Sequence, residues 1–499
     1  MLNCWDNLDG SVERGYAGRS LFFEDGHLAY DPERIRNLGR LLASCGINLL
    51  CINNVNLLYD AQRLMEDLLP DVGRLASLLR PFGVRLMLSC DFALPLRHGL
   101  DTADPLDERV QAFWRDRADI LWDYVPDLAG FLVKADSEHR PGPFTYGRSH
   151  AEGANMLAEA VSSHGGIIVW RAFVYNCFEH YMPLDGQFRD NVILQIKNGP
   201  YDFQVEEPIS PLLLGLKNTR LAMEFQLTQE YTGHQVDIYA MPTFWKEVFA
   251  DLPEGRIHAL AGVANFGRDR CITGHPFAAL NLFGFGQIAW DPKLQPEGLI
   301  EMWCKLTYPD LDEEQHRALC DLLLCSRQVY AKYTACLGLD WMVVPGLHYG
   351  PSPDGYEYAS WGTYHRADRN AVGIDRTGSG TGYLLQYPPE LQARYGNPDT
   401  CPEELLLFFH RLRYDHVLRD GRTLIQRIYD DHFEGYEAVL EMEKTLRQLA
   451  PALPDADAQL VLERIEKQKE NAREWRDVVN TFFHRLSGVE DAKGRIIYD

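Results

Sequence analysis

Eight short apolar runs alternate with longer stretches of helical periodicity through the first 300 or so residues. Apolar runs bounded by Gly or polar residues predict buried strands, and apolar residues three and four apart predict amphipathic helices. The predicted strands are Gly15–Phe23, Ile47–Asn54, Val84–Phe92, Gly130–Ala135, Gly166–Phe173, Asn191–Asn198, Arg220–Leu227 and Gly262–Phe266. The helical stretches between them include Asp31–Cys45, Ala61–Phe82, Asp107–Tyr124 and His150–His164.

Eight such units over about 250 to 300 residues are the number that a (β/α)8 (TIM) barrel requires. An open doubly wound sheet is the alternative. No G-x-G-x-x-G turn follows the first predicted strand, however, and the count of eight favours closure. We therefore predict an α/β fold with a barrel over residues 1–300.

The pattern changes after about residue 300. Long amphipathic helices are predicted over Leu299–Thr307, Glu313–Leu337, His432–Leu449 and Ala458–Leu486. The stretch 340–430 is dense in Gly, Pro, Tyr and Asp, which predicts long loops. We therefore expect a second, mainly α-helical domain over residues 301–499. The charged faces of its last two helices are more often solvated or dimer-forming than active surfaces.

Composition excludes several classes of protein. The formal net charge of −23 argues against a nucleic-acid partner, which needs a clustered basic surface. No apolar run of about 18 residues occurs, so no membrane span is expected, and the N-terminus does not resemble a signal peptide. Eleven Cys are scattered without a CxxC pair, which predicts reduced thiols in the cytoplasm rather than disulfides or a zinc site.

The fourth predicted strand has an unusual end. Gly130 opens it, an apolar run follows, and Lys134, Asp136, Ser137 and Glu138 come directly afterwards. Charges at the end of a buried strand lose hydration unless they are paired or used. On residue types alone, charges that simply extend into solvent are as good an explanation as a functional site.

Other predicted strands end in the same way. In a (β/α)8 barrel the chemistry lies at the carboxyl ends of the strands, where the loops converge. Three cations and three acids follow strands four to seven: Lys134, Arg171, Lys197, Glu138, Asp202 and Glu230. For any one of them, a structural ion pair is at least as good an explanation as a functional role. It is much less plausible that the whole group converges by chance.

These residue types fit two roles. Cations in a pocket bind a carboxylate or phosphate, and carboxylates around it serve as general acid and base. We expect no metal and no cofactor, because the strand ends supply almost no His and Lys would repel a divalent ion. Aromatic residues also lie near these strand ends: Trp5, Trp170, Tyr201, Phe203 and Tyr231. Any one of them is more often a core residue than a binding surface. Together with paired carboxylates, however, aromatic rings that stack on sugars suggest glycoside hydrolysis.

Longer motifs carry a resemblance to a known family. They are Cys4–Gly18, Ile52–Asn56, Thr102–Asp107, Gly130–Gly147, His150–Met156, Trp170–Asn176, Gln195–Gly199, Thr228–Gly233 and Tyr364–Asp368. On these blocks the chain resembles the α-glucuronidases of glycoside hydrolase family 67, in a match that runs in order from about residue 3 to past residue 420. Those enzymes remove (4-O-methyl)glucuronic acid, joined α-1,2 to xylose, from glucuronoxylan fragments.

The resemblance implies a role for each site residue. Glu138 corresponds to the general acid, and Asp202 and Glu230 to the base carboxylates. Lys134, Arg171 and Lys197 would hold the uronate carboxylate, and Trp5 and Val55 would form the pocket wall around the 4-O-methyl group.

The family inverts at the anomeric carbon. We therefore expect Glu138 to lie about 6.5–9.5 Å from Asp202 or Glu230, rather than about 5 Å. For Glu138 to stay protonated near neutral pH, burial or a carboxylate such as Asp136 has to raise its pKa against the pull of Lys134.

The sequence departs from the family pattern in three places. The match begins almost at the first barrel strand, so the N-terminal β-sandwich that members usually carry is expected to be missing. The loop between Asn176 and Asn191 is shorter than expected. Arg413-Tyr414-Asp415 stands where the family typically has a Trp-Asp pair.

The leading hypothesis is an inverting α-glucuronidase acting on short aldouronic acids. Action on a different uronoside is the alternative within enzymes, and a non-catalytic uronate-binding protein is the alternative outside them. A metal-dependent isomerase or lyase is a distant fourth. The expected partners are small-molecule substrates and, through the C-terminal helices, a second copy of the chain.

Overall fold

The computed structural model describes residues 1–137, 141–172, 177–356 and 365–498. In this part of the chain, eight parallel strands close into a barrel in the order β1-β10-β9-β8-β7-β6-β5-β4. Their bounds are β1 (Leu2–Asn3), β4 (Leu49–Cys51), β5 (Arg85–Cys90), β6 (Gly130–Val133), β7 (Ile167–Arg171), β8 (Val192–Lys197), β9 (Leu221–Gln226) and β10 (Ala259–Val263). The predicted (β/α)8 barrel is confirmed.

The first strand is not the predicted one. Leu2–Asn3 pairs in parallel with both β10 and β4 and so closes the barrel. The predicted strand Gly15–Phe23 lies in the following loop and only its last residue enters a strand, β2 (Phe23–Glu24), which pairs with β3 (His27–Leu28). The segment was mistaken for a strand because its apolar residues Phe22 and Phe23 are buried in the core. The true first strand was missed because two residues are too few to show a period of two. The last strand, β10, also begins three residues before the predicted Gly262.

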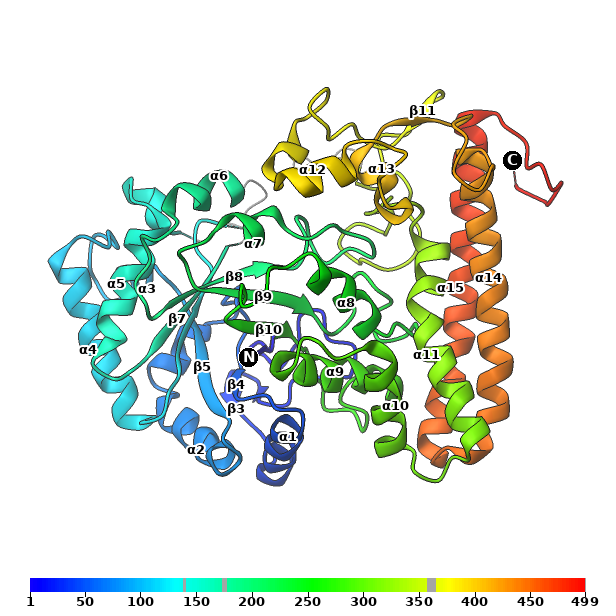
Figure 1. The fold of residues 1–499 in the computed structure, drawn as a ribbon. Helices are drawn as coiled ribbons and strands as arrows, with labels where there is room; N and C mark the ends of the chain where they lie inside the picture. Colours follow the sequence, from blue (N-terminus) through cyan, green and yellow to red (C-terminus); the bar gives the residue numbers. More distant parts are fainter. Residues whose placement is uncertain (138–140, 173–176, 357–364, 499) are drawn as a thin grey trace.

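Helices cover the outside of the barrel (Figure 1). They include α1 (Pro32–Ser44), α2 (Leu69–Leu79), α4 (Glu108–Tyr124), α5 (His150–Ser162), α8 (Pro242–Ala250) and α9 (Ala279–Trp290). Side-chain caps start three of them, because Asp31, Asp107 and Ser149 accept backbone N–H bonds from the first turn. The predicted helix Ala61–Phe82 is divided into η1 (Ala61–Met65), α2 and η2 (Arg80–Phe82), since Pro70 is suited to the start of a helix and not to its interior.

The C-terminal region is helical, as predicted. Its long helices are α10 (Pro296–Thr307), α11 (Glu313–Thr334), α14 (Leu424–Leu449) and α15 (Asp455–Ser487). Helix α11 packs against α14 and α15, and Figure 1 shows the three side by side next to the barrel. Helix α14 begins eight residues before the predicted His432. The domain boundary at residue 300 stays a prediction.

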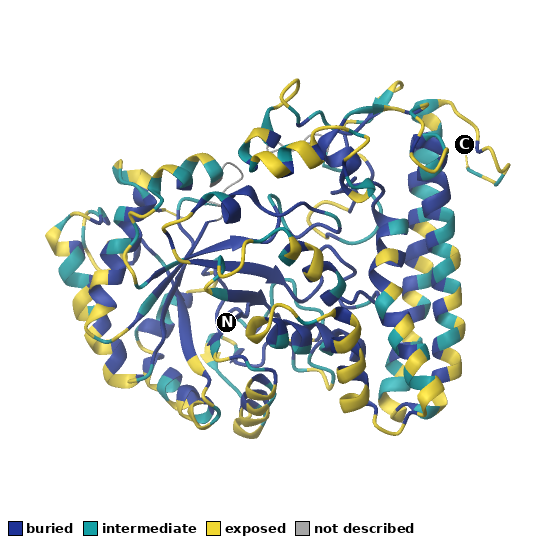
Figure 2. Cartoon of the chain, viewed as in Figure 1, coloured by how far each residue is buried: buried dark blue, intermediate teal, exposed yellow. Residues whose placement is uncertain are grey.

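Short elements and loops make up the described part of residues 335–423, so the loops predicted over 340–430 end where α14 begins at Leu424. They include β11 (Ala371–Val372), α12 (Pro389–Tyr395), α13 (Leu406–Phe409) and β12 (Leu412–Arg413). Figure 2 shows that the long helices are buried where they face one another and the barrel and exposed on the outside. No helix among the described residues has the length and apolar character needed to cross a membrane.

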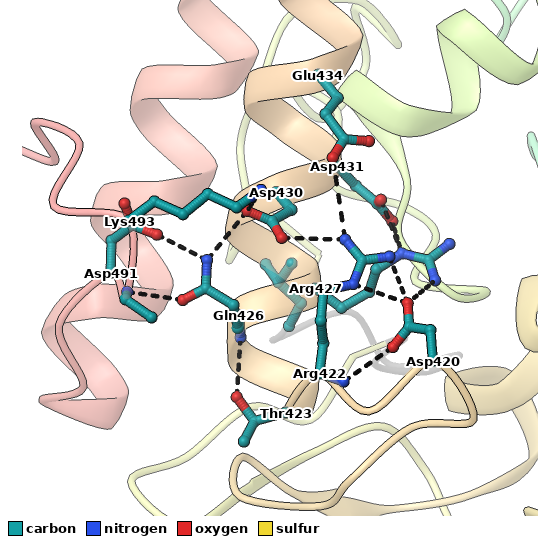
Figure 3. Close-up of polar contacts among 12 residues, drawn as sticks. Asp420, Arg422, Thr423, Gln426, Arg427, Asp430, Asp431, Glu434, Asp491 and Lys493 are labelled. Atoms are coloured by element: carbon teal, nitrogen blue, oxygen red, sulfur yellow. Dashed lines mark hydrogen bonds and ion pairs between the residues drawn. The ribbon is translucent and has the colours of Figure 1, made fainter.

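A buried carboxylate ties the C-terminal segment to α14 (Figure 3). Asp430 is fully buried and accepts from Arg422 at 3.0 Å, Arg495 at 2.5 Å and Lys493 at 2.9 Å. Burial opposes the charge of Asp430, but these cations outweigh it and hold its pKa below the usual value. Asp430 is therefore ionised at neutral pH.

Replacing Asp430 with Asn is expected to reduce the free energy of unfolding at pH 7 by about 1–3 kcal/mol, because three partly exposed cations then lose their charged partner. The folded-state pKa of Asp430 lies below its unfolded value. The stabilisation is therefore present above about pH 4 and lost as the pH falls through the folded value. Urea unfolding at pH 7 and pH 3 measures both effects. Glu441→Gln is the control, since it removes an exposed ion pair with Lys444 on the same helix and should have little effect.

Candidate active site

Three cations lie at the carboxyl ends of neighbouring strands. Lys134 follows β6, Arg171 ends β7 and Lys197 ends β8, and all three are buried. In Figure 1 the arrowheads of β8, β9 and β10 point toward the side where α11, α14 and α15 stand. The barrel end that carries the predicted site therefore faces the C-terminal region.

Arg171 is held by a carboxylate of β9, which lies two strands away in the same barrel. Its Nε and Nη2 donate to the two oxygens of Glu224 on β9, at 2.9 and 2.8 Å. The side chain of Glu224 is fully buried, so this is a bidentate ion pair inside the barrel. Glu224 was not among the predicted site residues. The pairing of β8 with β9 sets it directly beside Lys197.

Asp202 is the first of the two predicted base carboxylates. Its Oδ1 pairs with Lys197, and its Oδ2 accepts from the Tyr231 hydroxyl at 3.1 Å. Burial alone would raise the pKa of Asp202, but the charges of Lys197 and Arg171 outweigh burial and keep it below its usual value. Asp202 is therefore an anion and an acceptor.

The loop that carries Asp202 is fixed from behind by Glu207. The two Glu207 oxygens accept from the backbone N–H groups of Tyr201 at 3.0 Å and Gln204 at 2.5 Å. Burial raises the pKa of Glu207 to about 7. A Cβ on Gly199 would lie 2.0 Å from a Glu207 oxygen, so the turn requires glycine there.

Glu230, the second predicted base, is held by residues from distant parts of the chain. Its Oε1 lies 3.0 Å from Arg14 Nε and 2.9 Å from His348 Nδ1, and its Oε2 accepts from Gln226 at 3.3 Å. Arg14 lies in the loop after β1, and His348 lies in the loop region after α11. Sequence reasoning missed both, because nothing local marks residues whose partners are more than 100 positions away.

The loop bearing Glu230 is also bonded to the C-terminal helices. Asp237 accepts from Tyr333 on α11 at 2.8 Å, Tyr349 at 3.0 Å and Asn471 on α15 at 2.6 Å. Gln468 on α15 accepts the Ile238 N–H at 3.1 Å. The C-terminal helices therefore help to hold the loop that carries Glu230.

Lys134 is oriented by an amide. Its Nζ donates to Asn56 Oδ1 at 2.7 Å, and Asn56 in turn donates to Glu13 at 3.2 Å. Asn54 donates to the same Glu13 oxygen at 2.7 Å. The predicted motif Ile52–Asn56 thus supplies a side chain that positions the lysine.

Trp5 and Val55, the predicted wall residues, belong to one apolar cluster inside the barrel. Both are buried, and the Trp5 indole donates to Asn3 at 2.9 Å. The Arg171 guanidinium lies over the Trp5 ring, 5.5 Å from its centroid. The structure therefore brings this predicted wall next to one of the predicted cations.

Residues with left-handed backbone conformation border the site. Arg14, Asp136, Phe203, Gln229 and His348 all have φ between 52° and 62° without being glycine. Two of them bind Glu230, and the others adjoin Asp202 or Glu230 or lie two residues before Glu138. Such conformations cost free energy and concentrate at functional sites, where the surrounding structure holds them in place.

Glu138 lies outside the described residues, so its distance to Asp202 and Glu230 stays a prediction. Asp136, two residues earlier, accepts the Phe144 N–H at 3.1 Å, and His150 lies 3.9 Å away. Burial raises the pKa of Asp136. Asp136 therefore holds the backbone at Phe144, in the segment that leads to α5.

Two family models match the chain. Residues 1–254 match the glycosyl hydrolase family 67 middle domain, and residues 273–496 match the family 67 C-terminus. Curated relatives include a probable alpha-glucuronidase A of Aspergillus flavus, 39% identical over 531 residues, and alpha-glucuronidase A of Aspergillus tubingensis, 38% identical over 531 residues. Both alignments cover 99% of this chain and 63% of the relative, so the chain spans less than two thirds of their length. By these matches, the chain belongs to glycosyl hydrolase family 67.

Proposed function

We propose that the chain is an inverting α-glucuronidase that cleaves the α-1,2 bond between (4-O-methyl)glucuronic acid and xylose in glucuronoxylo-oligosaccharides. The observation that carries the proposal is the set of contacts that the two base candidates make. Asp202 and Glu230 each contact a cation, Lys197 and Arg14, and the Tyr231 and His348 side chains bridge them. Two carboxylates at the barrel mouth that each contact a cation are suited to activating water.

The proton donor is then a separate group, and we assign Glu138. In the proposed reaction, a water oxygen bonds to the anomeric carbon as the glycosidic C–O bond breaks. The water proton passes to the Asp202–Glu230 pair, and the departing xylose oxygen takes the proton of Glu138. The expected separation of about 6.5–9.5 Å between Glu138 and the base pair leaves room for that water.

The uronate carboxylate is assigned to Lys134, Arg171 and Lys197. Arg171 uses two of its five N–H groups on Glu224, and Lys197 pairs with Asp202, so both are fixed in direction. Lys134 is fixed by neutral Asn56. Trp5 lies beside Arg171 and shares an apolar cluster with Val55, which supports contact between this wall and a sugar whose carboxylate is held there.

Location and assembly are part of the proposal. We infer a cytoplasmic enzyme that receives imported oligosaccharides, since the ten cysteines with described side chains are free thiols, as a reducing compartment allows. We also infer a homodimer through the C-terminal helices, which sedimentation of the purified chain measures directly.

Replacing Glu138 with Ala is expected to lower kcat on aldotriouronic acid by about 10²–10⁴-fold, because the poor xylose leaving group needs a proton. Release of glucuronic acid is measured by chromatography. Glu179→Gln, which alters an exposed carboxylate, is the control and should keep wild-type activity. Near-normal release by Glu138→Ala would show that the acid is misassigned.

The stereochemical outcome tests the inverting geometry. NMR of the first turnovers should show the β-anomer of glucuronic acid before mutarotation, since a single displacement reverses the α-linkage. Initial release of the α-anomer contradicts the assignment of Asp202 and Glu230 as a base pair.

Replacing Lys134 with Met is expected to raise KM for aldotriouronic acid about 10- to 100-fold, because a charge-assisted hydrogen bond of about 1.5–3 kcal/mol is lost. The same variant should bind the corresponding neutral glucoside no worse than the wild type. The control is Lys217→Met, at an exposed position. Equal loss for both ligands would remove Lys134 from uronate recognition.

A further inference from the structure

Two cysteines meet where α10 packs against α11, away from the residues that the proposed mechanism uses. Cys304 lies in the last turn of α10 and is fully buried, whereas Cys320 lies in the first half of α11 and is partly exposed. Both thiols are free, and a side-chain hydrogen bond joins them. The junction of the two helices therefore holds a pair of thiols in contact, one buried and one accessible.

The contact makes the two thiols chemically unequal. A hydrogen bond from the Cys304 thiol stabilises a thiolate on Cys320, so the pKa of Cys320 is lowered and the pKa of Cys304 is raised. Partial burial opposes the thiolate on Cys320. Among the charged neighbours, Lys305 favours that thiolate, and Glu301 and Asp321 oppose it. Cys320 is therefore the more readily ionised sulfur of the pair, and Cys304 keeps its proton.

This arrangement is the one that oxidant-sensing cysteines share. The reactive sulfur of such a site has a lowered pKa, is accessible to solvent, and lies beside a second cysteine that resolves the oxidised product. Cys320 meets the first two conditions and Cys304 supplies the third. Cys325, on the same helix, is exposed but differs: its thiol donates to the Leu322 carbonyl at 3.3 Å, and partial burial of the sulfur raises its pKa.

We propose that Cys304 and Cys320 form a peroxide-sensitive dithiol, in which Cys320 reacts with a small hydroperoxide and Cys304 resolves the product as a disulfide between α10 and α11. The partial exposure of Cys320 suits a small oxidant, and the burial of Cys304 against it suits the second step. The inference does not rest on the proposed function, because neither thiol belongs to the site at the barrel mouth.

Oxidation takes two steps. In the first, the Cys320 sulfur gives two electrons to the distal oxygen of the hydroperoxide, so that an S–O bond forms and the O–O bond breaks. The leaving alkoxide takes up the proton that Cys320 had released. In the second, the Cys304 sulfur bonds to the Cys320 sulfur as the S–O bond breaks, and the hydroxide leaves as water with the Cys304 proton. Two thiols are thereby oxidised to one disulfide, and the hydroperoxide is reduced to an alcohol and water.

Mass spectrometry of the wild-type chain tests the proposal without any substitution. The reduced and desalted chain is treated with hydrogen peroxide at pH 7, the remaining thiols are alkylated with iodoacetamide in urea, and the chain is digested. We expect a peptide pair joined through Cys304 and Cys320, and dithiothreitol should restore both thiols. Recovery of both cysteines as alkylated thiols, at a peroxide dose that oxidises the exposed Cys325, overturns the proposal.

Single substitutions separate the two roles. In Cys304→Ser, Cys320 should still react, and its sulfenic acid should be trapped by dimedone, because the resolving thiol is gone. In Cys320→Ser, Cys304 should stay reduced, because it is buried and has lost its reactive partner. Oxidation of Cys304 in Cys320→Ser to the wild-type extent would contradict the assignment of Cys320 as the reactive thiol.

Cys325→Ser is the matched control, because it makes the same replacement on α11 at a cysteine whose thiol donates to a backbone carbonyl instead. It should form the disulfide between Cys304 and Cys320 to the wild-type extent. Loss of that disulfide in Cys325→Ser would show that Cys325 is the reactive thiol and refute the proposal. Release of glucuronic acid is no part of this readout, so failure of the proposed function leaves the result unchanged.

Discussion

The loop between β9 and α8 is the part on which the rest of the site depends. Its Asp237 is buried and accepts hydrogen bonds from Tyr333, Tyr349 and Asn471. Burial raises the pKa of Asp237 to about 6 although these donors oppose the rise. The carboxylate thus binds the loop to α11 and α15, and the same loop carries Glu230 and Tyr231. Hydrogen bonds to this loop therefore join the C-terminal helices to the barrel.

Ion pairs offset the cost of burying charged side chains at the barrel mouth. Burying a single ion costs several kcal/mol, and this cost is offset only by good geometry with a counter-ion. The mouth is organised in such pairs: Arg171 with Glu224, Lys197 with Asp202, and Arg14 with Glu230. The overall charge of −23 would repel an anionic sugar, and in the proposed function Lys134, Arg171 and Lys197 would counter that repulsion locally.

Prediction from the sequence succeeded where a segment was long and its signal local. Strands β5 to β9 lie within the predicted ranges because apolar runs of four to six residues are visible against polar flanks. The strand β1 was missed because two residues show no period. Gly15–Phe23 was mistaken for a strand because it contains apolar residues that are buried in the core, such as Phe22. The positions of Lys134, Arg171 and Lys197 at strand ends could be predicted because the strand-end rule applies to each strand separately.

The sequence by itself determined the fold class, the helices of the C-terminal region, and the acids and cations that follow the strands. These follow from periodicity and from residue types at strand ends, both properties of neighbouring positions. Only the tertiary structure decided which groups meet. The pairing of Arg171 with Glu224, and of Glu230 with Arg14 and His348, depends on closure of the barrel and on the fold of the chain after α11. Contacts between residues so far apart leave no local pattern, so hydrophobic periodicity cannot encode them.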